Sequence, residues 1–372
     1  MAISFDDTRW KKIQADSQKW WAGELKRPLV QVRLDGRDPG RTMPILPPFD
    51  MVDGAFADFT SFFDFSIPAE QIIDRWDYSL CSTEFIADGF PMIWPNFGAG
   101  VTAAFLGATL ENTADSTWFH HDGKEPIEKL SLKFDPGNKW FRRVCDIVQA
   151  AVNRWQGSVQ ACFTDLGGVL DVLSSFVGPE AIMFAMFDKH LEVKRLISEI
   201  HAAWWTYYEE FAKITQPTNP GYSAMGWIFA NRPHYMLQCD FAFMLSPAMF
   251  DEFVKPELAA SAAMLPNAFY HLDGSGQLAH LDSILEIENI RGIQWVPGVG
   301  QPDVSQWPDV YRKIRNAGKL VQIFDFQSPH GIKIMDIIAD QIGSLEGFVF
   351  MISQRMSQKD HVLAMLEKHR VL

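Results

Sequence analysis

The stretch AFYHLDGSG, residues 268–276, begins with a short apolar run and precedes a helix-like segment. It therefore predicts a β-strand that ends in a tight turn. His271 and Asp273 stand two residues apart, so on a strand their side chains point to the same face. The small residues Gly274, Ser275 and Gly276 let the backbone bend sharply or approach a ligand closely. An imidazole beside a carboxylate at a strand end suits a metal site, an acid–base pair or an oriented structural pair.

The same order of strand, turn and helix recurs on both sides of this stretch. Strands are predicted near 221–229, 235–238, 267–271, 292–296, 320–324 and 347–352. Helices are predicted between and after them, over 246–264, 277–289, 305–317, 331–341 and 357–369. Ser246 is the expected N-cap of the first of these helices, with Pro247 in its first turn. The strands are nearly all apolar, which is typical of parallel strands covered on both faces.

The amino-terminal half adds further elements of both kinds. Helices are predicted from 7 to 26, from 68 onward, and over 139–155, 169–187 and 190–214, and strands over 29–34, 89–94 and 158–163. Residues 35–69 are expected to form a long loop. A series of roughly eight alternating strands favours an α/β fold, a (β/α)8 TIM barrel with an N-terminal helical and loop extension. We expect one domain over 1–372, with residues 1–88 packed on the barrel as the extension.

Composition narrows the range of functions. The chain has 372 residues, a formal net charge of -13 and 47% hydrophobic residues. The acidic balance argues against non-specific binding of nucleic acid, which needs a basic face. The four cysteines are widely spaced, so we expect no disulfide framework. We expect no signal peptide, since no basic run followed by an apolar core begins the sequence, and no membrane span, since no apolar run of about 18 residues occurs. We expect a cytoplasmic protein that binds a small molecule, with no nucleic acid and no membrane as partner.

In a barrel, the loops after the strands build the binding site, so polar residues at strand ends are the candidates. His271 and Asp273 are the strongest pair. As a metal site, His271 is a ligand and Asp273 is either a second ligand or the acceptor that fixes the imidazole tautomer. Cys239, at the end of the preceding strand, is a third candidate ligand, or a small apolar filler. The alternative for the pair is a buried structural contact.

Other strand ends supply candidates for catalysis and for substrate binding. Asp240, Asp325 and Arg355 are the candidate catalytic residues that would orient the substrate. The candidate substrate-binding residues are Trp94, Asn96, Trp227, Trp295 and Gln354. Each has a structural alternative. Asp325 could cap the loop before Ser328, Arg355 could pair with Glu346, and a further carboxylate, Asp165, could cap a helix that begins at Val169.

Several segments together resemble the uroporphyrinogen decarboxylase superfamily, and most closely its cobalamin-associated methyltransferase branch. The resemblance covers most of the chain, in WWAGELKRPLV (20–30), WPNFGAGVTAAFLGA (94–108), TDLGGVLDVLSSFVGPE (164–180), LSPAMFDEFVKPEL (245–258), YHLDG (270–274), GIQWVPG (292–298) and WPDVYRKIRNAGK (307–319). It implies a (β/α)8 barrel, in agreement with the strand count. It also implies a zinc ion that binds a thiol, which accepts a methyl group from a methylcobalt corrinoid.

The chain departs from this family at the metal ligands. The resemblance implies a His-x-Cys pair and a distant cysteine, but this chain has His271-x-Asp273 and no cysteine near Ile352–Gln354. Oxygen in place of sulfur makes a harder and more Lewis-acidic site. The corrinoid motif DxHxxG is also incomplete, because Val193 stands where the glycine is needed after Asp188 and His190. Any corrinoid would therefore be carried by a separate protein.

These features predict a metal-dependent methyltransferase or demethylase with zinc as the expected metal. It would move a methyl group between a small substrate and a separate corrinoid protein or a thiol. A second hypothesis is a metal-free, decarboxylase-like enzyme that uses Asp240 or Asp273, although the arginine-rich N-terminal segment that the resemblance implies for decarboxylases is missing. A third is a non-catalytic accessory barrel beside a corrinoid protein. The sequence leaves a homodimer open.

Overall fold

The computed structural model describes residues 3, 5–46, 59–113, 116–121, 123 and 125–372. Part of the expected long loop, residues 47–58, therefore lies outside the described residues. The strands are β1 (Leu29–Asp35), β2 (Thr83–Ala87), β3 (Met92–Ile93), β4 (Thr109–Asn112), β5 (Thr117–His120), β6 (Gln160–Ala161), β7 (His234–Gln238), β8 (Asn267–Asp273), β9 (Ile290–Val296), β10 (Leu320–Phe324) and β11 (Phe348–Arg355).

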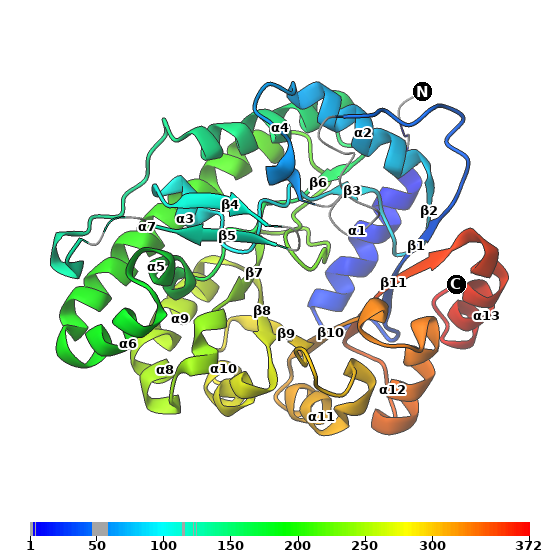
Figure 1. Ribbon diagram of the computed structural model, residues 1–372. Helices are drawn as coiled ribbons and strands as arrows, with labels where there is room; N and C mark the ends of the chain where they lie inside the picture. The colour runs from blue at the N-terminus through cyan, green and yellow to red at the C-terminus, as the bar shows by residue number, and fades with distance from the viewer. Residues whose placement is uncertain (1–2, 4, 47–58, 114–115, 122, 124) are drawn as a thin grey trace.

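The α-helices of the described residues are α1 (Asp7–Trp21), α2 (Ala69–Cys81), α3 (Thr102–Phe105), α4 (Lys139–Trp155), α5 (Val169–Val177), α6 (Pro179–Asp188), α7 (His190–Thr215), α8 (Pro247–Phe253), α9 (Lys255–Met264), α10 (Leu281–Leu285), α11 (Pro308–Asn316), α12 (Ile334–Ile342) and α13 (Lys359–Lys368). In the carboxy-terminal half of the chain, helices alternate with strands. Helices α8 to α13 run along the outer side of strands β7 to β11 (Figure 1).

Seven strands form one sheet in the order β2-β1-β11-β10-β9-β8-β7. Every neighbouring pair is parallel except β1 with β2. Strands β3 and β6 make a separate parallel pair, and β4 and β5 make a hairpin. The predicted α/β fold is therefore confirmed as a mixed fold built around a mostly parallel sheet. In the described residues the hydrogen-bond ladders do not join eight strands into one closed ring.

Several predicted elements have different bounds in the structure. The predicted strand near 221–229 is reduced to one bridge between Tyr222 and Ala230. The predicted helix over 169–187 is two helices, α5 and α6, because Gly178 interrupts it with φ +89°. The helix expected over 246–264 breaks after Phe253, and Pro256, which lacks an N–H, stands at the start of the second piece. By contrast, the prediction for Lys139–Trp155 is confirmed as α4, and Ser246 caps α8.

Alternation along the strands gives the main sheet two distinct faces. On β8, Tyr270 and Leu272 belong to the large core between the sheet and its helices. Phe269, two residues before His271, belongs to a smaller apolar cluster on the other side. We call this second side the inner face. His271 and Asp273 follow Phe269 at a spacing of two, so the residues of greatest chemical interest lie on the inner face.

Helix α1 covers the amino-terminal ends of the strands. Trp20 donates its indole N–H to the carbonyl oxygen of Phe348, the first residue of β11, at 3.1 Å. The ring of Trp21 lies 5.4 Å from that of His234, the first residue of β7. Both tryptophans are almost fully buried and pack in the inner-face cluster. Because α1 covers this end, the opposite end, at the carboxyl ends of the strands, is left for ligands.

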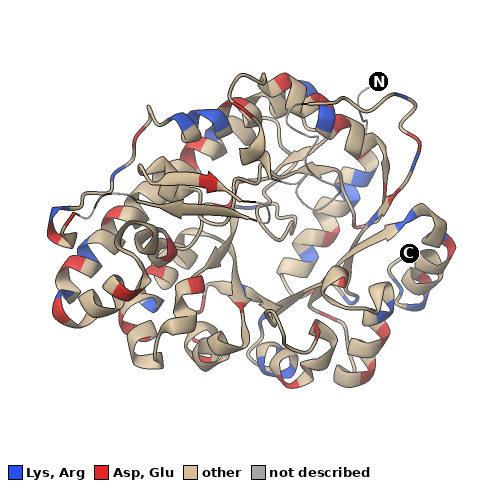
Figure 2. Ribbon diagram, in the orientation of Figure 1, with Lys and Arg blue, Asp and Glu red and all other residues tan. Residues whose placement is uncertain are grey.

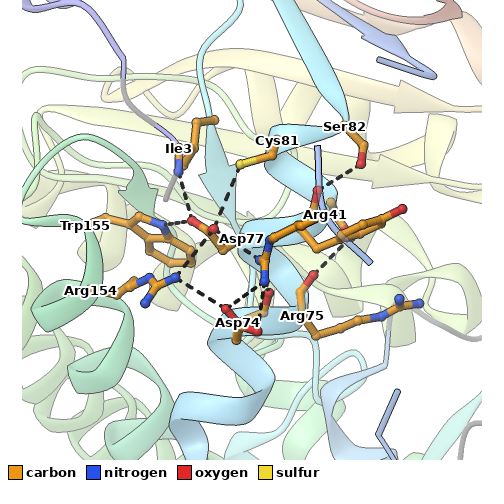
Figure 3. A network of polar contacts seen from close by, with 11 residues as sticks. Ile3, Arg41, Asp74, Arg75, Asp77, Cys81, Ser82, Arg154 and Trp155 are labelled. Carbon is orange, nitrogen blue, oxygen red and sulfur yellow. Dashed lines mark hydrogen bonds and ion pairs between the residues drawn. The ribbon is translucent and has the colours of Figure 1, made fainter. Parts of the chain in front are cut away.

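A buried carboxylate joins α2 to α4 and to the start of the chain (Figure 3). Asp77 is fully buried. It accepts hydrogen bonds from the backbone N–H of Ile3 at 3.1 Å and from the indole N–H of Trp155 at 2.9 Å. The guanidinium groups of Arg41 and Arg154 lie 3.3 and 3.6 Å from its other oxygen. The position of α2 therefore depends on one acidic side chain.

Charged residues lie mostly on the helices and outer loops and are sparse on the sheet (Figure 2). Among the described residues, no single helix is long and apolar enough to cross a membrane. Helices α5 and α6 together meet the criteria of length and composition, but they are bent by 103° where they meet.

Replacing Asp77 with alanine should lower the free energy of unfolding by about 3–5 kcal/mol, because its buried donors lose their acceptor and the guanidinium groups lose their counter-charge. The matched control is Asp309→Ala on α11, where a side chain that is 94% exposed pairs with Arg312. That change should cost less than about 0.5 kcal/mol. Urea unfolding measures both. Equal losses for the two variants would contradict the role given to Asp77.

Candidate functional site

Three side chains converge at the carboxyl ends of β7 and β8. Asp240 is the first residue of a short 3₁₀ helix, Asp240–Met244, directly after β7, and His271 and Asp273 are at the end of β8. One ligand atom from each residue lies within 4.8 Å of the other two. Of the described residues, these three form the one group of acidic, histidine or cysteine side chains with metal-binding geometry. Two of the members, His271 and Asp273, are those predicted from the opening stretch.

His271 belongs to a row of polar side chains that crosses four strands at one level. The strand register pairs it with Gln238 on β7 and with Gln294 on β9, and pairs Gln294 with Gln322 on β10. The Nδ1 atom of His271 is hydrogen-bonded to Oε1 of Gln294. The amide nitrogen of Gln294 donates to Oε1 of Gln322 at 2.8 Å, and Gln322 donates to the carbonyl oxygen of Gly226.

The direction of these hydrogen bonds follows from the last acceptor. A backbone carbonyl oxygen can only accept, so Gln322 must turn its NH2 group toward Gly226. The side-chain oxygen of Gln322 then faces Gln294 and accepts a hydrogen bond from the NH2 group of Gln294. The side-chain oxygen of Gln294 therefore faces His271 and accepts from its ring. His271 must therefore carry its proton on Nδ1. The lone pair of Nε2 is left available for a ligand, which is the arrangement of a histidine metal ligand with an oriented partner.

Gly226 is required at the end of this row. Its φ is +83°, in the left-handed region that favours glycine. A Cβ atom there would lie 2.6 Å from Cε of Met236 and 3.0 Å from Oε1 of Gln322. The next residue, Trp227, also has a positive φ of 61°, which is unusual for a bulky side chain. The turn that ends the row thus holds strain of the kind found at ligand-binding sites.

Two further carboxylates surround the three converging residues. Asp165 is buried and accepts hydrogen bonds from the backbone N–H of Gly167 at 2.9 Å and from Gln238 at 3.3 Å. Asp171 accepts from the backbone N–H groups of Asp240 and Phe241, at 3.0 and 2.7 Å. Asp171 therefore fixes the position of Asp240. Burial is the main cause that raises the pKa of Asp165 to about 6 and that of Asp171 to about 7.

The pKa of Asp240 is raised. Desolvation by the surrounding protein, followed by the negative charges of Asp273 and Asp165, raises the pKa of Asp240 to about 7. Solvent still reaches this residue and moderates the desolvation. The repulsion among the carboxylates remains, because they face one another from β7, β8 and the loop before α5. A cation placed between them would remove this repulsion.

The donor set suits a divalent metal ion. Two carboxylates and one imidazole nitrogen match the ligands of zinc and of other first-row metals in catalytic sites, where a coordination position stays open. Oxygen donors predominate, so the site is harder than one built from thiolates. A second observation supports a bound group at this place. Gln238 is the strand neighbour of His271, and its side-chain oxygen Oε1 is buried without a hydrogen-bond partner among the described residues. A ligand or metal-bound water would supply the missing donor.

Two residues predicted for the site point to the other face of the sheet. Cys239 packs in the large core with Tyr235 and Leu237, because it stands one residue from Asp240 and alternation reverses its direction. Burial and the charges of Asp171 and Asp240 raise the pKa of its thiol. Trp295 is 1% exposed and packs against Trp307 with ring centroids 5.1 Å apart. Neither side chain belongs to the converging group.

The predicted residues on β10 and β11 form a group of their own. Asp325 is buried and accepts from the backbone N–H of Ser353 at 3.0 Å and from Gln354 at 2.6 Å, so it ties the ends of the two strands together. Its pKa is raised by burial. Arg355 is exposed and lies with Asp35 and Gln354 at a shallow depression. The alternative of an Arg355–Glu346 pair is wrong, because Glu346 pairs with Lys26.

Three of the five predicted substrate-binding residues line a single cavity. Trp94, Asn96 and Trp227 contribute to a cavity of about 430 Å³ at the sheet. This volume is within the range of small-molecule binding sites.

Asp165 does not cap α5: the N-cap position is Gly168, and no side chain makes the capping hydrogen bond.

The sequence contained a signal for the residues that the prediction missed. Gln322 stands at the centre of the buried, otherwise apolar strand β10, and Gln238 ends the fully buried strand β7. Gln294 lies in the buried part of β9 that follows the exposed Arg291. A buried amide needs a partner, so a glutamine in such a strand indicates a polar network. That they lie at one level could be known only from the register. Asp171 had no distinctive signal, since an acidic residue in the first turn of a helix is common.

Comparison with known proteins supports the fold. No family model matches the sequence, and no curated protein matches it. A solved methyltransferase from Methanosarcina mazei is similar in structure, with a TM-score of 0.60 and 12% sequence identity. The similarity covers 96% of this chain and 98% of that chain. At this identity the likeness extends to the fold alone.

The row of hydrogen bonds predicts the tautomer of His271. In metal-free protein at a pH where the ring is neutral, ¹⁵N NMR should find the proton on Nδ1. Gln322→Met conserves volume but removes the fixed direction, so the Gln294 amide can turn and His271 should show both tautomers. Gln149→Met, on the exposed side of α4, is the control and should change nothing. A wild-type proton on Nε2 would contradict the proposed direction.

Proposed function

We propose that the protein is a metal-dependent methyltransferase or demethylase, and that Asp240, His271 and Asp273 hold the metal. The observation that carries the proposal is the convergence of these three side chains within 4.8 Å, with His271 oriented by the glutamine row. The similarity of fold to a methyltransferase supports it. The sequence resemblance to the uroporphyrinogen decarboxylase superfamily, with its (β/α)8 barrel and corrinoid-dependent branch, points the same way.

Each residue has a defined part in this proposal. His271 presents Nε2 because the glutamine row holds the proton on Nδ1. Asp240 and Asp273 supply two negative charges, and Asp171 fixes Asp240 through two backbone N–H groups. A divalent cation such as zinc would supply Lewis acidity, polarising a substrate oxygen or lowering the pKa of an acceptor nucleophile. The methyl group leaves as a formal cation, so the acceptor must provide an electron pair.

The second participant in the reaction belongs to the proposal as well. A thiol, or a corrinoid on a separate protein, would exchange the methyl group with a small substrate. Because this chain lacks a complete DxHxxG motif, the proposal assigns any corrinoid to a separate protein. The oxygen-rich ligand set favours an oxygen or nitrogen substrate over a thiol at the metal, because thiolate ligands are the ones that keep a bound thiol nucleophilic.

A second candidate function is metal-free acid–base chemistry of the decarboxylase kind. The observation that favours it is the pKa of Asp240, which is raised to about 7. A carboxyl that is partly protonated at neutral pH can donate a proton to a substrate. Metal content separates the two candidates, because the second needs no metal ion.

Purified protein should contain about one equivalent of a divalent transition metal per chain. His271→Ala and Asp240→Asn should each lower metal affinity by more than about 100-fold, since they remove ligands, and Gln294→Leu by about 10- to 100-fold, since it removes the partner of Nδ1. His361→Ala, at an exposed site on α13, is the matched control. Metal analysis and competition with a chelator measure these effects.

Protein without stoichiometric metal would rule out the proposed function. Where metal is bound, methyl transfer is assayed from methylcobalamin to a thiol and from candidate methyl donors to free cobalamin, with and without added corrinoid protein. Turnover that is lost in His271→Ala supports the enzyme. Metal binding with no transfer in any arm would instead favour the accessory role.

Metal affinity should also depend on pH. The pKa of Asp240 is raised, so in metal-free protein its carboxyl holds a proton below about pH 7, and a metal ion must displace that proton. The apparent Kd should therefore fall by up to about tenfold per pH unit as pH rises from about 5.5 to 7, and level off above. Calorimetry in buffers of different ionisation enthalpy measures the released proton. An affinity that is constant over this range would contradict the assignment of Asp240.

A further inference from the structure

The cavity of about 430 Å³ has an unusual charge for this chain. Its lining includes Arg33 and Arg75 and, among the described residues, no Asp, Glu, Lys or His. Arg33 is paired with Asp35 at 3.4 Å, so Arg75 carries the uncompensated charge. The whole chain carries a formal net charge of -13. A positively charged cavity in an acidic protein favours an anionic ligand.

Among the residues that the structure describes, Arg75 has no acidic partner for its charge. The preceding residue, Asp74, pairs with Arg41 and Arg154, and Figure 3 shows the guanidinium group of Arg75 directed away from that network. The Nη1 atom of Arg75 is buried and has no hydrogen-bond partner. Leaving a guanidinium group desolvated and unpaired costs free energy, which an anion bound in the cavity would offset.

The rest of the wall is aromatic. Trp94 packs edge-to-face on Trp227 with centroids 6.2 Å apart, Trp227 packs on Phe324 at 5.6 Å, and Phe324 on Phe326 at 4.7 Å. The indole N–H groups of both tryptophans are buried without an acceptor. The left-handed backbone of Trp227 holds its ring in this wall. Flat apolar surfaces with unpaired donors suit a planar ligand that carries acceptor oxygens.

The cavity and the converging triad share the inner face of one sheet. Phe324 lies two residues after Gln322, and Asp273 lies two residues after His271, so both point to the inner face one layer beyond the glutamine row. In the strand register Phe324 is paired with Met351 on β11, and Met351 with Gln31 on β1. Met351 and Gln31 both line the cavity. A ligand anchored near Arg75 therefore lies over the same face as the triad.

We propose that the cavity binds a one- or two-ring aromatic carboxylate, with the carboxylate held by Arg75 and the ring against Trp94 and Trp227. A carboxylate fits because the planar guanidinium fork can bind its two oxygens side by side. Identification of this compound as the substrate class rests on the proposed function. The binding itself depends only on the cavity.

The test is titration of the native protein with benzoate and 2-naphthoate, and with the neutral amides benzamide and 2-naphthamide, by calorimetry or ligand-observed NMR. Each acid should bind about 10- to 100-fold more tightly than its amide, since the amide lacks the charge-assisted contact. Arg75→Gln should remove that difference and leave amide binding unchanged. Arg75→Lys should keep part of the difference. Arg312→Gln, on the exposed surface of α11, is the matched control and should change neither affinity.

The acids should still bind to the His271→Ala variant, which lacks the metal ligand. Failure of the proposed metal-dependent function and failure of acid binding can therefore be distinguished. Trp227→Phe should weaken acid and amide alike, because it removes wall area and an N–H donor. The proposal is overturned if neither acid shows saturable binding below about 10 mM, a weak affinity even for a small ligand. It is also overturned if acid and amide bind equally to the native protein, or if phenyl phosphate binds far more tightly than benzoate.

Discussion

The hydrogen bond from Gln322 to the carbonyl oxygen of Gly226 is the constraint on which the site depends. A carbonyl oxygen has no proton to give, so it sets the direction of every hydrogen bond that follows it through Gln294 to His271. The imidazole proton is placed on Nδ1 by a backbone atom that is three hydrogen bonds away. Gly226 can occupy this place because it has no Cβ and adopts a positive φ.

The fold makes this row possible. Parallel strands β7 to β10 place Gln238, His271, Gln294 and Gln322 at one level, and α1 covers the opposite end of the sheet. One layer above the row, the inner face carries acidic residues at the β7–β8 side and aromatic residues at the β10–β11 side. A cation and an aromatic anion can thus be held on one surface, each where the local charge favours it.

The sequence predicted the local features that alternation and capping determine. The pairing of His271 with Asp273 on one face, helix α4 and the Ser246 cap all follow from neighbouring residues. Alternation also explains why the side chains of Cys239 and Trp295 do not lie beside Asp240, His271 and Asp273. Each stands one residue away from a position that faces the inner face, so it points to the other side of the sheet. The glutamine row and the part of Asp171 depend on register and on a loop distant in sequence. Those relations come from tertiary packing, which local patterns do not contain.

An anomalous difference map from a crystal of the metal-loaded protein, recorded at the absorption edge of the bound metal, would show whether these three side chains hold one metal ion. We expect one peak at about 2.0–2.2 Å from Nε2 of His271 and from a carboxylate oxygen of both Asp240 and Asp273. Nδ1 of His271 should remain on Gln294. A peak bound through Nδ1 or through the sulfur of Cys239, or no peak between these residues, would contradict this expectation.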